Sequence, residues 1–163
     1  MTLGQQFLKE LEAEASATKK CLERIPENLY GYKPHEKSMA MGYLALIVAE
    51  VPLWTHVMAT TSEIDFVKFN HFQAKTAAEL AKHFDDNMAL ARQSLATVSD
   101  ETLQEKFELK ANGHVVMETT KEQSIGPSIN HMVHHRGQLT VYMRLNNLQV
   151  PSIYGPSADE GGF

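Results

Sequence analysis

Residues 129–139, with the sequence INHMVHHRGQL, place three histidines and an arginine in an otherwise helical pattern. An α-helix turns about 100° per residue, so His131 and His135, four positions apart, share one face while His134 points aside. Imidazole nitrogens from such a pair can chelate one divalent ion, although no glutamate follows the first histidine as in helical metalloprotease motifs. The alternative is a pair of polar side chains that hydrogen-bond inside the protein. Arg136 is expected to form a charge pair between helices.

The composition argues against several classes of protein. The 163 residues are predicted to form one domain, residues 1–163. With 15 basic and 20 acidic residues the net charge is −5, so no basic stripe is available for nucleic acid. Glutamates near the N-terminus and the lack of a run of 18 apolar residues predict neither a signal peptide nor a membrane span. The single cysteine, Cys21, is expected in the core of a cytoplasmic protein.

The hydrophobic pattern predicts four long helices. Apolar or small residues recur at helical spacing in the first segment, which stops at Pro26. The second helix is SMAMGYLALIVAEVPLWTHVM, for which Ser38 is the expected N-cap and in which Pro52 should produce a kink. A capping box at residues 76–79 begins the third helix, and the fourth spans roughly residues 120–147.

The segments between and after these helices carry weaker signals. Residues 60–75 are expected to form a loop or a short helix, and Asn112–Gly113 between two short runs predicts a hairpin. The Pro- and Gly-rich tail should fold back over the helices, with Tyr154 docked and Asp159 or Glu160 paired with a basic side chain. Long helices with few strands between them predict an all-α four-helix bundle, with a small hairpin-like excursion before the last helix.

Two longer segments resemble those of a known family. NHMVHHRGQLTVYMRLNN followed by VPSIYGPSADE resembles the C-terminal signature of the DinB family (DinB/YfiT-like proteins), and MGYLALIVAEVPLW resembles its second helix. The resemblance covers nearly the whole chain. It implies a four-helix bundle, usually a homodimer, with a divalent metal held by three histidines, two of which match His131 and His135. It also implies an activity like that of thiol S-transferases and isomerases, in which the metal activates a low-molecular-weight thiol.

The second helix departs from the family pattern at Ile47, where relatives carry the third histidine. Isoleucine cannot bind a metal, and catalytic zinc sites ordinarily use three protein ligands. Glu50, about one turn further along, is the candidate replacement ligand for zinc or nickel. Its alternative role is a buried carboxylate that pairs with Arg136 or a histidine. His71 and His83 lie outside this helix, and the sequence does not place them.

The sequence leaves two functions open. One is a metal-dependent transferase that acts with a low-molecular-weight thiol and holds zinc or nickel through His131, His135 and Glu50. The other is a non-catalytic dimer, either a small-molecule binder or a stress-response protein, whose metal site has degenerated. Neither assigns a catalytic residue or a substrate. For both, the predicted pocket residues are Gln138, Tyr142, Ile47 and Trp54.

Overall fold

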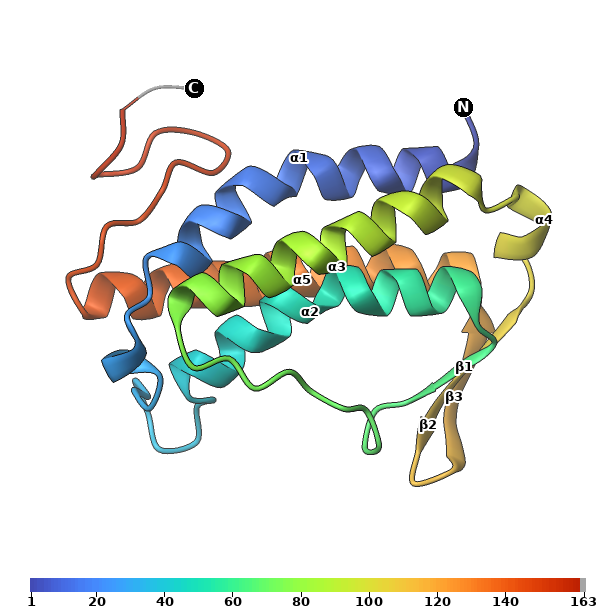
Figure 1. The fold of residues 1–163 in the computed structure, drawn as a ribbon, viewed down its shortest axis with the longest axis horizontal. Coiled ribbons are helices and arrows are strands. Elements are labelled where there is room, and N and C mark those ends of the chain that lie inside the picture. The colour runs from blue at the N-terminus through green and yellow to red at the C-terminus, as the bar shows by residue number, and fades with distance from the viewer. Residues whose placement is uncertain (162–163) are drawn as a thin grey trace.

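Four long helices pack side by side, and a small sheet covers one end of them, in the computed structural model, which describes residues 1–161 (Figure 1). The long helices are α1 (Leu3–Glu23), α2 (Met41–Thr60), α3 (Ala77–Thr97) and α5 (Lys121–Leu145). Helices α1 and α2 each pack against both α3 and α5, so their apolar faces enclose one shared core. The short helices η1 (Glu27–Leu29) and α4 (Asp100–Leu103) lie in the connections.

The starts of the helices follow local sequence signals in most cases. The predicted capping box at Thr76 is confirmed, and α1 and α5 begin at similar boxes. The predicted N-cap at Ser38 is wrong, because α2 begins after Ala40. There the loop before the helix folds back, and the Met41 N–H donates to the Tyr32 carbonyl. A long-range backbone contact therefore satisfies a donor at this helix end.

Helix α2 is the central element of the core. By length and composition it could cross a membrane, but 61% of its apolar window is buried inside the protein, as in the core helix of a soluble domain. Pro52 lies within the helix and is itself buried. The apolar character of α2 on most sides is therefore explained by packing against α3 and α5.

A three-stranded sheet makes this a mixed α and β fold, so the prediction of an all-α chain is wrong. Its strands, in spatial order, are β1 (Glu63–Asp65), β2 (Lys106–Ala111) and β3 (His114–Thr120). The predicted hairpin is confirmed, with φ of 51° at Asn112 and 84° at Gly113 between antiparallel β2 and β3. Strand β1 pairs parallel to β2, and the Asp65 carboxylate accepts hydrogen bonds from the N–H groups of Asn112 and Gly113.

A buried ion pair joins α5 to α1. The Arg136 guanidinium is 1% exposed, its Nη2 lies 2.6 Å from the Glu14 carboxylate, and its Nη1 donates to the Thr18 hydroxyl. The predicted charge pair between helices is thus confirmed. Cys21 on α1 is fully buried, and burial raises the pKa of its thiol to about 11. It is a core residue, as predicted.

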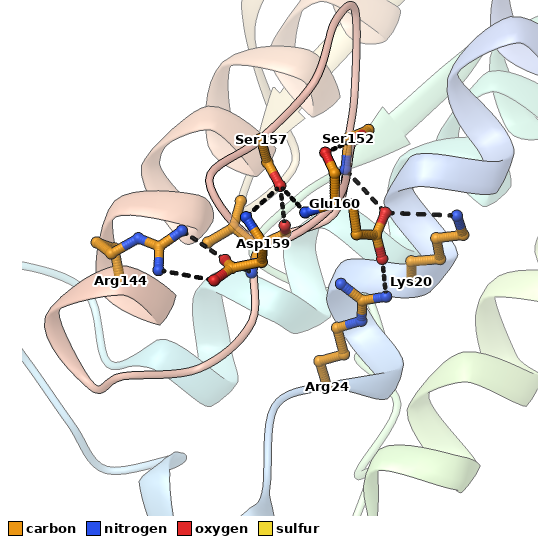
Figure 2. Close-up of polar contacts among 8 residues, drawn as sticks. Lys20, Arg24, Arg144, Ser152, Ser157, Asp159 and Glu160 are labelled. Atoms are coloured by element: carbon orange, nitrogen blue, oxygen red, sulfur yellow. Dashed lines mark hydrogen bonds and ion pairs between the residues drawn. The ribbon is translucent and has the colours of Figure 1, made fainter. Parts of the chain in front are cut away.

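The C-terminal tail folds back and binds the ends of α1 and α5 through its acidic residues (Figure 2). Asp159 lies 2.5 Å from the Arg144 guanidinium, and Glu160 pairs with Arg24. The Tyr154 hydroxyl reaches the buried ion pair between α1 and α5. The fold-back and the pairing of Asp159 and Glu160 with basic side chains are confirmed, whereas Tyr154 is 70% exposed and makes these contacts through its hydroxyl alone.

Candidate functional site

A cavity of about 430 Å³ lies where α2, α5, the sheet and the loop after β1 meet. This volume is within the range of small-molecule sites. The wall on α2 is a stripe at helical spacing, formed by Tyr43, Ile47, Trp54 and Met58. The wall on α5 is a stripe of small and polar positions, formed by Ser124, Pro127, Ser128 and His131.

The third wall is one cross-strand row of the sheet. Ile64 of β1 pairs with Leu109 of β2, which pairs with Met117 of β3. Residues paired in this way stand on the same face of a sheet, and all three line the cavity. The sheet that the sequence did not predict as a unit therefore contributes a complete wall of the site.

The fourth wall is formed by the loop between β1 and α3, residues 66–76, which we call the aromatic loop. It runs from β1 back along α2 to α3 (Figure 1). Ring centroids in this region form a continuous series of contacts: Tyr43 to His71 (6.2 Å), His71 to Phe69 (5.3 Å) and Phe69 to Trp54 (6.3 Å). Trp54 in turn stacks on His131 at 5.9 Å. Five rings therefore follow one another around the cavity, and three of the four contacts are edge-on, a favourable geometry for aromatic pairs.

Glu50 of α2 binds this loop through two hydrogen bonds. Its carboxylate is fully buried, with Oε2 2.6 Å from His71 Nδ1 and Oε1 accepting a hydrogen bond of 2.8 Å from the Phe72 N–H. His83 of α3 lies 3.8 Å from the same carboxylate and stacks on Phe72. Since a buried carboxylate without partners is costly, these contacts fix the position of the loop relative to α2.

The helix brings His131 and His135 together. Their Nε2 atoms lie 2.6 Å apart, and His135 Nδ1 lies 2.8 Å from Gln138 Oε1. Because the amide oxygen of Gln138 accepts, His135 carries its proton on Nδ1, and its Nε2 accepts from the Nε2–H of His131. His134 is exposed on the adjoining face. The two histidines thus satisfy each other through one hydrogen bond.

The residues present do not complete a three-ligand metal centre. A tetrahedral zinc ion with Zn–N bonds of about 2.0–2.1 Å would hold two nitrogens ~3.3 Å apart, beyond the hydrogen-bonded separation of His131 and His135. Ile47 supplies an aliphatic surface to the cavity, and Glu50 is already bound to the loop. Across residues 1–161, no three His, Cys, Asp or Glu side chains are grouped so that they could hold a metal ion.

The predicted pocket residues divide into two sets. Ile47 and Trp54 line the cavity, whereas Gln138 is exposed beside His135 and Tyr142 is buried with its hydroxyl donating to a backbone carbonyl. Along α5, the positions that follow His131 on its face of the helix lie progressively further from the cavity. Of the histidine pair and these two residues, only His131 lines the wall. The largest omission of the sequence reasoning is the aromatic loop. The segment FVKFNHF is unusually aromatic for a connection, and this density is the signal that could have revealed it.

Burial lowers the pKa of two histidines near the site. For His83 burial is the largest cause, and it outweighs the opposing effects of Glu50 and Asp86. His131 is exposed at the rim, but partial burial lowers its pKa, and repulsion from His135 adds to this effect. Both side chains therefore favour the neutral form more than a free histidine does.

Comparison with known proteins identifies the family. The sequence matches the DinB family over residues 1–161. The chain belongs to the DinB family. It is 30% identical over 162 residues to the uncharacterized protein YrdA of Bacillus subtilis, with 94% of this chain and 89% of YrdA covered.

Two solved structures share the fold of this DinB-family chain. The DinB-like protein YjoA of Bacillus subtilis superposes with a TM-score of 0.69 at 22% identity, covering 91% of this chain and 97% of YjoA. A DinB-like protein of Bacillus cereus superposes with a TM-score of 0.68 at 23% identity, covering 92% of this chain and 97% of the other. At this level of identity the likeness establishes the fold.

Acidification should destabilise the protein through His83. The pKa of this side chain is below its ordinary value of 6.5 in the folded chain, so the unfolded chain takes up a proton first. The contribution of neutral His83 to the free energy of unfolding is fully present above about pH 6.5. It is lost as the pH falls toward the pKa of His83 in the folded chain. In urea unfolding between about pH 7.5 and 5.5, His83→Gln should lose less stability than the unmodified protein. The exposed His114→Gln is the control, and equal losses in all three proteins would contradict this role for His83.

Ile47→His should create zinc affinity. The change adds a third imidazole, from the α2 wall, to the cavity that His131 lines from α5, and three protein ligands suit a zinc ion. In competition with a chromophoric chelator, we expect zinc affinity to rise at least about tenfold. The double variant Ile47→His/His131→Ala is the control and should lose this gain. Unchanged affinity in the single variant would show that position 47 does not face the histidine pair.

Proposed function

We propose that this DinB-family protein binds an apolar aromatic small molecule in the cavity between α2, α5, the sheet and the aromatic loop. The observation that carries the proposal is the continuous series of rings from Tyr43 to His131, facing the apolar cross-strand row of the sheet. Of the two functions that the sequence leaves open, this is the small-molecule binder.

The apolar surface of the cavity supplies the driving force. Tyr43, Phe66 and Met117 line it and are 48%, 49% and 48% exposed, respectively, so much of their apolar surface is in contact with water. Covering such surface with a ligand is favourable by about 25 cal/mol per Å². Ring-to-ring contacts with a planar ligand would add about 0.5–1.5 kcal/mol each. An aromatic ligand gains from both effects.

One end of the cavity wall also has unmet hydrogen-bonding capacity. The indole Nε1 of Trp54 and the hydroxyl of Ser128 are buried without hydrogen-bond partners among residues 1–161. Trp54 stacks on His131, and Ser128 lies three positions before it on the same helix. Buried polar atoms usually have partners, so a water molecule or a polar ligand group near this end would stabilise the complex.

The thiol S-transferase activity implied by the family resemblance makes a different demand on the chain. Activation of the thiol requires a bound metal, for which His131 and His135 supply two donors while position 47 supplies none. Binding of an apolar ligand needs only side chains that already line the cavity. The proposed function therefore rests on residues that are all present.

Fluorescence of N-phenyl-1-naphthylamine, which rises in apolar surroundings, tests the proposal. Trp54 is the only tryptophan and lies in the cavity wall, so energy transfer from it reports a probe bound there. Met117→Glu should weaken binding about tenfold, because the bound probe would deprive the new charge of water.

The matched control for this experiment is Val115→Glu. Val115 is on the same strand and has the same exposed fraction of 48%, but it lies outside the wall that residues 1–161 form around the cavity. Its affinity for the probe should stay within about twofold of the unmodified protein. Equal weakening by both substitutions, or no energy transfer from Trp54, would overturn the proposed function.

A further inference from the structure

The imidazole of His71 lines the cavity, and a buried acid sets its orientation. His71 Nδ1 lies 2.6 Å from Glu50 Oε2, and the rings of Phe69 and Tyr43 contact His71 from the side. The side chain is 29% exposed, whereas Glu50 is 1% exposed. Because Nδ1 is bound to the buried carboxylate, Nε2 is the ring nitrogen left for a ligand, and His71 lines the cavity.

The contact with Glu50 determines which nitrogen of His71 carries the proton. An ionised carboxylate only accepts hydrogen bonds, and Glu50 also accepts one from the Phe72 N–H through its other oxygen. His71 must therefore donate through Nδ1–H, which leaves a lone pair on Nε2 when the ring is neutral. In the part of the chain that the structure describes, Nε2 has no hydrogen-bond partner.

We propose that His71 Nε2 accepts a hydrogen bond from the ligand, and that the ligand is an aromatic compound with a hydroxyl group. This inference rests on the proposed function, because it adds a polar recognition element to the same cavity. Phe69 and Tyr43 beside His71 provide surface for the aromatic body, and Nε2 selects the hydroxyl. His71 thereby distinguishes phenol-like compounds from aromatic ethers of similar size.

Displacement of N-phenyl-1-naphthylamine by two matched compounds tests the inference. 2-Naphthol carries a hydroxyl donor, whereas 2-methoxynaphthalene keeps the rings and the oxygen but has no donor. At about pH 8, where histidine in model peptides is neutral, 2-naphthol should displace the probe at about a tenfold lower concentration. Naphthalene should bind about as well as the methoxy compound.

His71→Asn is the decisive variant. The asparagine amide can still donate to Glu50 from near the position of Nδ1, so the buried carboxylate keeps a partner, but Nε2 is removed. Loss of the imidazole ring should weaken 2-naphthol and 2-methoxynaphthalene alike, and the preference for 2-naphthol should fall to within about twofold. His114→Asn, an exposed histidine on β3, is the control and should keep the full preference.

Glu50→Gln provides a second, independent variant. With its oxygen still accepting from the Phe72 N–H, the glutamine presents its NH2 group to His71 Nδ1, and the proton of the imidazole moves to Nε2. Nε2 then becomes a donor, and the preference for 2-naphthol over 2-methoxynaphthalene should be lost. Circular dichroism establishes whether each variant is folded, and His71→Asn carries the test if Glu50→Gln is not.

The outcomes separate the inference from the proposed function. If naphthalene and 2-methoxynaphthalene both fail to displace the probe, the proposed function itself fails. If both displace it but 2-naphthol binds no better, binding stands and the role of His71 is overturned. A preference for 2-naphthol that survives in His71→Asn overturns that role as well.

Discussion

A buried carboxylate must have partners, and the partners of Glu50 determine how this protein closes its cavity. Glu50 lies on the most buried helix, where a charge is tolerated only when it is hydrogen-bonded. His71 and the Phe72 N–H satisfy it, and both belong to the loop between β1 and α3. The loop is thereby held along α2, and its aromatic side chains form one wall of the cavity. The need of the buried Glu50 carboxylate for hydrogen-bond partners thus determines where the aromatic side chains of the loop line the cavity.

Ile47 changes the chemistry of the same region. At the position where the resemblance implies a histidine, the aliphatic side chain extends the apolar stripe of α2, and His131 and His135 hydrogen-bond to each other. Ile47 therefore has two consequences: position 47 offers no metal donor, and the stripe on the α2 wall has an aliphatic side chain there. The aromatic contacts from Tyr43 to His131 fit the second of these consequences.

Features set by neighbours in sequence could be predicted, and features set by distant contacts could not. The facing pair His131 and His135, the hairpin at Asn112–Gly113 and the capping box at Thr76 all depend on short spacings, and the structure contains each of them. Strand β1 has three residues, too few to show an alternating pattern, and it exists through pairing with β2, more than 40 residues away. The sheet was therefore underestimated, and the fold class was wrong.

The site shows the same division. Ile47, which the family resemblance draws attention to, and Trp54 are two of the predicted pocket residues, and both lie in the α2 wall. The sequence does not place His71, because its position depends on the carboxylate of Glu50, which lies 21 residues earlier in the chain. Gln138 and Tyr142, also predicted as pocket residues, lie further along α5 than His131 and beyond the end of the cavity.

A crystal structure of the protein with 2-bromonaphthalene tests the central claim most directly, because the anomalous scattering of bromine marks the ligand and that of a metal marks any bound ion. We predict a bromine peak inside the cavity, beside Trp54 and Phe69. Bromine found only outside the cavity, or a metal ion bound between His131 and His135 with no ligand in the cavity, would contradict it.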